Sequence, residues 1–131
     1  MKNTNYTIAD VKMILGRIKY YIEKDQYIIS QNNNRLKNIG FIKNYGLKSS
    51  MIKSILLNLS PLDFCYSTPN QNTRYPYGEL YVFCPTLKFI SEYCESEVLV
   101  YIKLSLVESP EMVVIVISFH DTKIAEKYLF K

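Results

Sequence analysis

The sequence is poor in the residues from which most metal and redox sites are built. Its 131 residues contain one histidine, His120, and three cysteines, Cys65, Cys84 and Cys94, without a C-x-x-C pair. These counts exclude a metal centre built from histidines and argue against a structural zinc site or a disulfide framework. A magnesium site made of carboxylates alone stays open, but no aspartate pair suggests one. We therefore expect neither a metal nor a cofactor.

Long apolar runs are also missing. No run approaches the roughly 18 residues that cross a bilayer, and the first ten residues, MKNTNYTIAD, lack the apolar core of a signal peptide. The hydrophobic content of 48% and charged content of 21% are typical of a folded protein. A length of 131 residues fits one core. We expect a single cytoplasmic domain, residues 1–131, without a membrane partner.

Negative charge is scarce in the first half of the chain. Residues 1–60 hold ten Lys/Arg against three Asp/Glu, a balance of +7, whereas residues 61–131 hold six against nine, or −3. A basic half suits a nucleic acid or an acidic protein as partner. Solvated helix faces need lysines as well, so the charge alone decides nothing.

Helical signals gather in this basic half. Apolar spacing predicts a helix after Thr7, which is a good N-cap with Asp10 three residues on. The other expected helices are a short one ended by Gly40, one over 48–59 capped by Ser49 or Ser50, a turn begun by Ser60 and Pro61, and a short C-terminal helix over 121–130.

Strand signals follow in the second half. We expect strands at 79–84, 97–107 and 112–119, with a turn at 108–111 between the last two, and a short strand or extended link at 26–30. Residues 67–78 are a polar loop, and 85–96 form a connection that contains a helical turn. This order predicts an α+β fold, with N-terminal helices on one face of a twisted antiparallel sheet.

Alternation along 97–107 brings polar residues to one face of the predicted sheet. Val98, Val100, Ile102, Leu104 and Leu106 share one face. Tyr101 and Lys103 share the other, about 7 Å apart. The neighbouring strand ends at His120. A tyrosine, a lysine and a histidine near one sheet face suit the handling of a phosphodiester, and an ordinary polar sheet face is the alternative.

RNA cleavage without a metal needs a base for the 2′-hydroxyl proton, a cation or donor at the phosphorus, and an acid for the leaving 5′-oxygen. One histidine cannot fill both proton-transfer roles, so tyrosine and lysine share the work. Arg74 and Lys88 are candidate phosphate contacts. Dependence on the 2′-hydroxyl confines such an activity to RNA.

Other catalytic schemes have weaker signals. The sequence has no G-x-S-x-G, no P-loop and no G-x-G-x-x-G. A cysteine nucleophile, Cys65 or Cys84, paired with His120 stays open. A buried cysteine is the commoner outcome for this residue type.

Four motifs occur in order: LSPLDFCYS (59–67), YGELYVFCP (77–85), VYIKLSLV (100–107) and VVIVISFHD (113–121). With them the chain resembles the MqsR-type mRNA interferases, toxins of a type II toxin–antitoxin system. The corresponding family pattern is roughly L-S-x-x-D-F-Y-K-S, W-Q-D-V-Y, V-Y-L-K and V-L-I-V-S-F-K. The match covers about residues 34–121. It implies a RelE-like fold, ribosome-independent cleavage of mRNA, and neutralisation by a cognate antitoxin.

The family's functional residues carry over unevenly. Its tyrosine falls on Tyr101, with the following lysine on Lys103. Its lysine in D-F-Y-K-S falls on Tyr66, its glutamine on Gly78, and its final lysine on His120. The resemblance thus implies Tyr101, His120, Tyr66 and Lys103 as catalytic residues. The cation lost at Tyr66 needs a substitute, for which Arg74 is the expected source.

Three hypotheses follow. The first is a toxin-type endoribonuclease that cleaves mRNA without a metal and is inhibited by an antitoxin. The second, motivated by Tyr66 and Gly78, is a catalytically degenerate member that binds RNA or a protein. The third is an unrelated regulator whose basic helices, through Lys12, Lys19 and Lys53, engage an acidic protein.

Overall fold

A computed structural model describes residues 1–30, 35–70, 78–90, 93–107, 112–124 and 126–131. In this part of the chain three α-helices and one 3-10 helix accompany six strands, which makes an α+β fold. The elements are α1 (Ile8–Glu23), β1 (Tyr27–Ile29), α2 (Leu36–Asn44), α3 (Ser49–Leu57), η2 (Pro61–Asp63), β2 (Phe64–Thr68), β3 (Leu80–Phe83), β4 (Thr86–Ile90), β5 (Glu95–Val107) and β6 (Val113–Asp121). No helix among the described residues is long and apolar enough to span a membrane.

The sheet is mixed, which corrects the prediction of a purely antiparallel one. Its strand order is β1-β6-β5-β3-β2, and β4 pairs with β5 outside that path. β1 runs parallel to β6, with Tyr27 opposite Val114. The other pairs are antiparallel. Because the whole chain between β1 and β6 intervenes, no tight turn forces these two strands to run in opposite directions.

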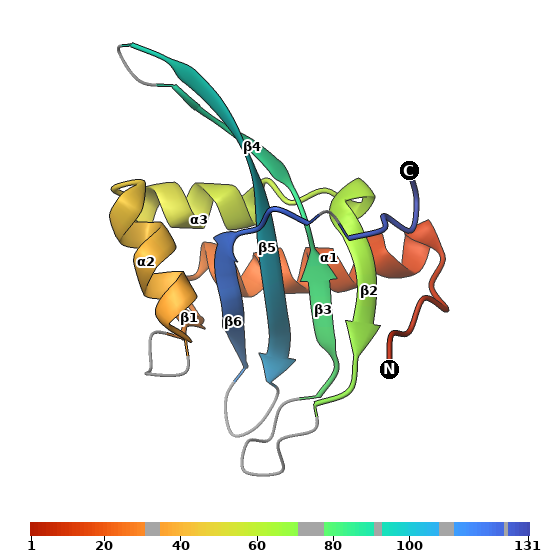
Figure 1. Cartoon of the computed structure of the whole chain (residues 1–131). Coiled ribbons are helices and arrows are strands. Elements are labelled where there is room, and N and C mark those ends of the chain that lie inside the picture. Colours follow the sequence, from red (N-terminus) through yellow and green to blue (C-terminus); the bar gives the residue numbers. More distant parts are fainter. Residues whose placement is uncertain (31–34, 71–77, 91–92, 108–111, 125) are drawn as a thin grey trace.

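Helix α1 begins as predicted. The Asp10 amide donates to Thr7 Oγ1 at 3.1 Å, and the Thr7 amide donates to Asp10 Oδ2 at 2.8 Å. The buried residues Val11, Leu15, Ile18 and Ile22 follow helical spacing. Figure 1 shows α1 and α3 behind the sheet, so these side chains pack in the core between the helices and the sheet, on what we call the sheet's inner face. We call the opposite side of the sheet its outer face.

Two helix boundaries differ from prediction. Gly40 does not end α2, which continues to Asn44, because mid-helix glycine costs only about 1 kcal/mol and the next residue, Phe41, is buried in the core. Gly46, with a φ of +58°, follows the helix, and the Leu47 amide closes the end onto the Ile42 carbonyl at 2.9 Å. The N-cap of α3 is Lys48 rather than Ser49 or Ser50, and its side chain makes no capping bond.

Two predictions about the second half are wrong. The segment predicted as a connection with a helical turn contains β4, and together with β5 it makes a ribbon that projects beyond the body (Figure 1). The predicted C-terminal helix is not formed in the described residues 121–124 and 126–131. Instead the tail is tied to the sheet. The Leu129 amide donates to the Phe64 carbonyl at 3.0 Å, and the Tyr128 hydroxyl donates to the Cys84 carbonyl at 2.5 Å.

The predicted alternation along β5 is confirmed. Val98, Val100, Ile102 and Leu104 are buried in the main core, and Leu106 packs against it. A second, smaller apolar cluster lies on the outer face, made of Cys65, Tyr66, Val82 and Cys84 with Leu99, Tyr101 and Tyr128 packed against it. Here the C-terminal tail passes in front of the sheet (Figure 1). Of the predicted site residues, Tyr66 is therefore a buried member of this packed patch, and Tyr101 packs against it.

Candidate functional site

The pairing of β5 with β6 brings two predicted site residues together. Tyr101 lies directly opposite His120 in the ladder. Their rings are stacked, with centroids 5.5 Å apart and an interplanar angle of 21°. Both side chains are partly exposed. The contact joins a phenol and an imidazole on the open side of the sheet.

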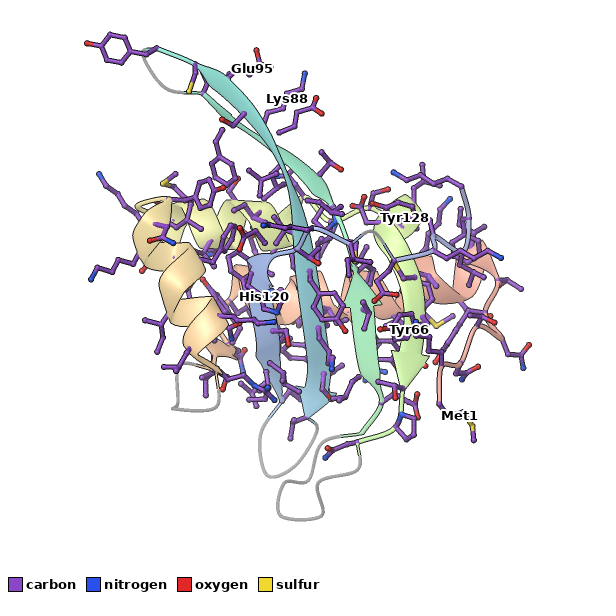
Figure 2. All side chains as sticks on the ribbon, in the orientation of Figure 1. Met1, Tyr66, Lys88, Glu95, His120 and Tyr128 are labelled. Carbon is purple, nitrogen blue, oxygen red and sulfur yellow. The ribbon has the colours of Figure 1, made fainter. Side chains whose placement is uncertain are left out.

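Tyr66 reaches the same place from β2. Its hydroxyl lies 3.3 Å from the Tyr101 hydroxyl, although β3 runs between the two strands. A bulge at Cys65 lets β2 present Tyr66 on the outer face. Figure 2 shows Tyr66 and His120 on the same side of the sheet, from strands on either side of β3 and β5. The result is a row of three rings across the sheet.

The hydrogen bond of His120 defines its tautomer. Nδ1 lies 2.9 Å from the backbone carbonyl oxygen of Asp121. A carbonyl only accepts, so Nδ1 carries the hydrogen in the neutral ring and the lone pair is on Nε2. A neutral imidazole held in this way acts as a proton acceptor through Nε2.

The environment of Tyr101 keeps its phenol protonated. Burial raises the pKa of Tyr101 well above its ordinary value, and the hydrogen bond with Tyr66 raises it further. Tyr101 is therefore a poor general base near neutral pH. It is suited instead to donate a hydrogen bond to an oxygen that gains negative charge.

Lys103 lies two residues along β5 from Tyr101, on the same face as predicted. Its Nζ is 5.8 Å from the centroid of the Tyr101 ring. Burial lowers the pKa of Lys103, and the positive charge of Arg35 lowers it further. The Lys103 ammonium therefore gives up its proton more readily than an exposed lysine does.

Arg35 is the residue that the sequence analysis missed. It directly precedes α2, and its charge acts on Lys103 across the fold. Nothing in the sequence distinguishes it from the other basic residues of the first half, since its role depends on where α2 packs against β6. We name Tyr66, Tyr101, Lys103 and His120, with Arg35 beside them, the outer-face cluster.

Of the two predicted phosphate contacts, Lys88 does not join this cluster. Lys88 lies on the projecting ribbon opposite Glu97, and its Nζ is 3.5 Å from Glu95 Oε1. Glu97 is four residues before Tyr101, about 13 Å along an extended strand. Figure 2 shows Lys88 far from His120 and Tyr66. Arg74 lies outside the described residues.

The alternative pairing of a cysteine with His120 has no contact to support it. Cys65 and Cys84 are buried side by side, and Cys65 Sγ donates to the Asp63 carbonyl at 3.5 Å. A hydrogen bond with Cys84, then burial, raises the pKa of Cys65, which disfavours its thiolate. Among the described residues no group of three His, Cys, Asp or Glu side chains is arranged to hold a metal ion.

The outer-face cluster combines three kinds of chemistry on one side of the sheet. It offers a proton acceptor on His120, neutral donors on Tyr66 and Tyr101, and a half-buried cation on Lys103 beside Arg35. This combination suits a phosphate ester that passes through a more negative transition state. In comparisons with known proteins, no family model, no curated protein and no solved structure matches this chain.

Proposed function

We propose that the chain is a metal-independent endoribonuclease of the MqsR type, with a RelE-like fold, that cleaves mRNA and is inhibited by a cognate antitoxin. The observation that carries this proposal is the stacked pair of His120 and Tyr101 beside Lys103. Two of the sequence motifs that resemble the family supply these residues, from β5 and β6, and a third motif adds Tyr66 from β2. Together they support the chemistry that strand cleavage through the 2′-hydroxyl requires.

The proposed reaction uses each group in one role. His120 Nε2 removes the proton of the 2′-hydroxyl, and the resulting oxygen attacks the adjacent phosphorus. The bond from phosphorus to the 5′-oxygen breaks, and the Lys103 ammonium protonates that leaving oxygen. The products are a 2′,3′-cyclic phosphate and a 5′-hydroxyl. The lowered pKa of Lys103 favours its role as the acid.

Charge on the phosphorane is met by donors and cations of the cluster. The hydroxyls of Tyr66 and Tyr101 donate to a non-bridging oxygen, and Arg35 adds a positive charge. Arg35 thus takes the place of the cation that the family carries where this chain has Tyr66. With Arg35 as the substitute cation, the proposed reaction does not need a lysine at position 66.

A catalytically degenerate binding protein is the second candidate. Gly78 supports this candidate, because glycine has no side chain with which to replace the family's glutamine at this position. The third candidate, a regulator working through its basic helices, has less support. Lys53 is engaged by Asp25 at 2.9 Å, and Lys19 is half-buried with its pKa lowered by that burial.

The test is cleavage of a labelled single-stranded RNA by the purified chain, with DNA of the same sequence alongside and with a chelator present. We expect RNA cleavage that resists the chelator, leaves 2′,3′-cyclic phosphate ends and spares DNA. His120→Ala should reduce the rate by about a hundredfold because a proton-transfer group is lost, and Tyr101→Phe should reduce it by about a hundredfold because one donor to the developing negative charge is lost. Tyr20→Phe, on the exposed side of α1, is the matched control.

If the RNA stays intact in the presence of folded protein, the proposed endoribonuclease activity is refuted. If RNA nevertheless binds, the degenerate member is favoured. Full activity in both Tyr101→Phe and His120→Ala would remove the site assignment while leaving the activity. For the antitoxin, a small neighbouring reading frame is the place to look, and its co-expression should restore growth and protect transcripts.

A further inference from the structure

A cavity of about 390 Å³ lies on the outer face next to Tyr66. Its volume is within the range of small-ligand sites. Three separate segments form it: the N-terminus, β2 and the C-terminal tail. The lining residues are Lys2, Thr4, Cys65, Tyr66, Glu126, Lys127, Tyr128 and Leu129.

Backbone hydrogen bonds hold both terminal segments in place around this cavity. The Asn3 amide donates to the Ser67 carbonyl at 2.7 Å, and the Ser67 amide donates back to Asn3 at 2.9 Å. On the other side, Leu129 and Tyr128 bond to the carbonyls of Phe64 and Cys84. The walls are therefore part of the sheet's hydrogen-bonding pattern rather than loose ends.

The lining indicates a flat aromatic ligand that carries negative charge. Tyr66, Tyr128 and Leu129 supply ring and aliphatic surface. Lys2 is a cation of the lining, and its Nζ lies 4.6 Å from the centroid of the Tyr66 ring. Lys127, also in the lining, is exposed. Stacking rings and lysines are the two features that single-stranded nucleic-acid sites combine.

One acid of the cavity is already engaged. Glu126 Oε2 accepts from Lys2 Nζ at 3.1 Å, and the Lys2 side chain is 61% exposed. A phosphate would compete for this lysine, which is long enough to turn toward solvent. The carboxylate would then accept from the N–H groups of a base.

Tyr66 links this cavity to the outer-face cluster. Its ring lines the cavity while its hydroxyl meets Tyr101. From β6 with His120 to β2 with Tyr66 there are three strand spacings, about 14 Å. We propose that the cavity is a subsite for a nucleotide of single-stranded RNA that flanks the one at His120. This inference rests on the proposed function, whose substrate it extends.

The first test measures binding of a 2′-O-methyl RNA oligonucleotide, which lacks the attacking hydroxyl, by fluorescence anisotropy. Lys2→Ala with Lys127→Ala should weaken binding about tenfold and lower the salt dependence by about 0.7 for each lost phosphate contact. Lys12→Ala with Lys24→Ala removes the same charge from α1 and its C-cap, on the far side of the sheet, and should change neither.

A second pair of variants tests the stacking wall. Tyr128→Ala should weaken binding at least fivefold, whereas Tyr128→Phe keeps the ring, loses the hydrogen bonds of the hydroxyl and should bind like the unchanged chain. Circular dichroism of each variant checks the fold.

The outcomes separate this inference from the proposed function. RNA cleavage with binding unchanged in the lysine and Tyr128→Ala variants would overturn the subsite and leave the nuclease standing. Binding that depends on these residues without any cleavage would support the subsite and refute the nuclease. If the Lys12→Ala with Lys24→Ala control lost as much RNA affinity, the effect would be explained by net charge alone, and the subsite would be overturned.

Discussion

Individual side chains of the outer-face cluster are adapted to their roles by what surrounds them. Burial, and then the hydrogen bond with Tyr66, raises the pKa of Tyr101 and so favours its neutral form. Burial, and then the charge of Arg35, lowers the pKa of Lys103. A single carbonyl fixes the tautomer of His120. In the proposed mechanism, His120 and Lys103 thus share the two proton transfers that a pair of histidines would otherwise make.

Arg35→Gln tests the coupling between Arg35 and Lys103. Loss of the arginine removes one of the two causes that lower the pKa of Lys103, so that pKa rises. If Lys103 is the acid, the alkaline limb of the rate profile moves to higher pH, and the rate falls about tenfold because a cation near phosphorus is lost. Lys37→Gln, exposed on the same helix, is the control. An unshifted limb would contradict the role of Lys103.

Tyr101 also predicts a pH dependence of stability. Its pKa is raised on folding above the ordinary value of 10.0, so the folded chain holds a proton that the unfolded chain releases. This contribution is complete below pH 10 and is lost as pH rises beyond it, by at most about 1.4 kcal/mol per pH unit. Urea unfolding on both sides of pH 10 should show a shallower decline in Tyr101→Phe. Equal slopes would refute the shift.

Gly78 is open to a side chain. A Cβ built there meets nothing within 4 Å, so Gly78→Gln should fold with a stability change within about 0.5 kcal/mol. If the family's glutamine contributes to catalysis, this variant cleaves RNA faster. Gly46→Gln is the contrasting control, since its φ of +58° should cost about 1–2 kcal/mol. Unfolding of Gly78→Gln would contradict the open geometry.

At the scale of elements, the position of His120 depends on a clamp between α2 and β6. The ladder passes from Lys103–Ser118 to Leu104–Val116, so Ile117 has no partner on β5. The side chain of the buried Asn38 bonds to the β6 backbone at this point. It donates to the Ile117 carbonyl at 2.9 Å and accepts from the Phe119 amide at 2.8 Å. The bulge and the asparagine together orient the end of β6.

Asn38→Ala should destabilise the fold more than an ordinary surface substitution. It leaves the carbonyls of Ser30 and Ile117 and the Phe119 amide without their partner, at a cost of about 3 kcal/mol in the free energy of unfolding. Chemical denaturation measures this cost, with Asn44→Ala, exposed at the end of α2, as the control. A loss below 1 kcal/mol, roughly one hydrogen bond, would show that the clamp is dispensable.

Local signals predicted some elements and missed others for identifiable reasons. The cap of α1 and the β5–β6 pair were predicted because Thr7, Asp10 and the alternation in 97–107 carry their information locally. β4 was missed because its strand pairing, not its composition, defines it. The predicted C-terminal helix is not formed in the described part of the tail because Leu129 bonds to β2 and Tyr128 bonds to Cys84, which directly follows β3.

At the scale of the molecule, the two ends of the chain close over the same edge of the sheet. Asn3 bridges to Ser67 of β2, and Lys2 pairs with Glu126 of the tail. The tail in turn covers Cys65 and Cys84, whose exposures are 1% and 0%. The closure gives the outer face both its packed cluster and the cavity beside Tyr66.

Thiol reactivity reports on this closure. In the folded chain Cys94 is exposed and should react rapidly with a thiol reagent, while Cys65 and Cys84 react slowly. Tyr128→Ala removes a tie of the tail and should speed the two slow reactions at least tenfold, with Tyr20→Ala as the control. Rates that stay the same would show that the tail does not protect these cysteines.

The sequence by itself determined the α+β class, the cap of α1, the inward and outward faces of β5, and the presence of a tyrosine and a lysine on one face. These follow from local periodicity, which residues impose on their own neighbours. Only the tertiary structure decided that Tyr66 meets Tyr101 over an intervening strand, that Arg35 acts on Lys103, that Lys88 lies away on a ribbon, and that the tail walls a cavity. Each of these depends on contacts between segments far apart in the chain, which no local pattern encodes.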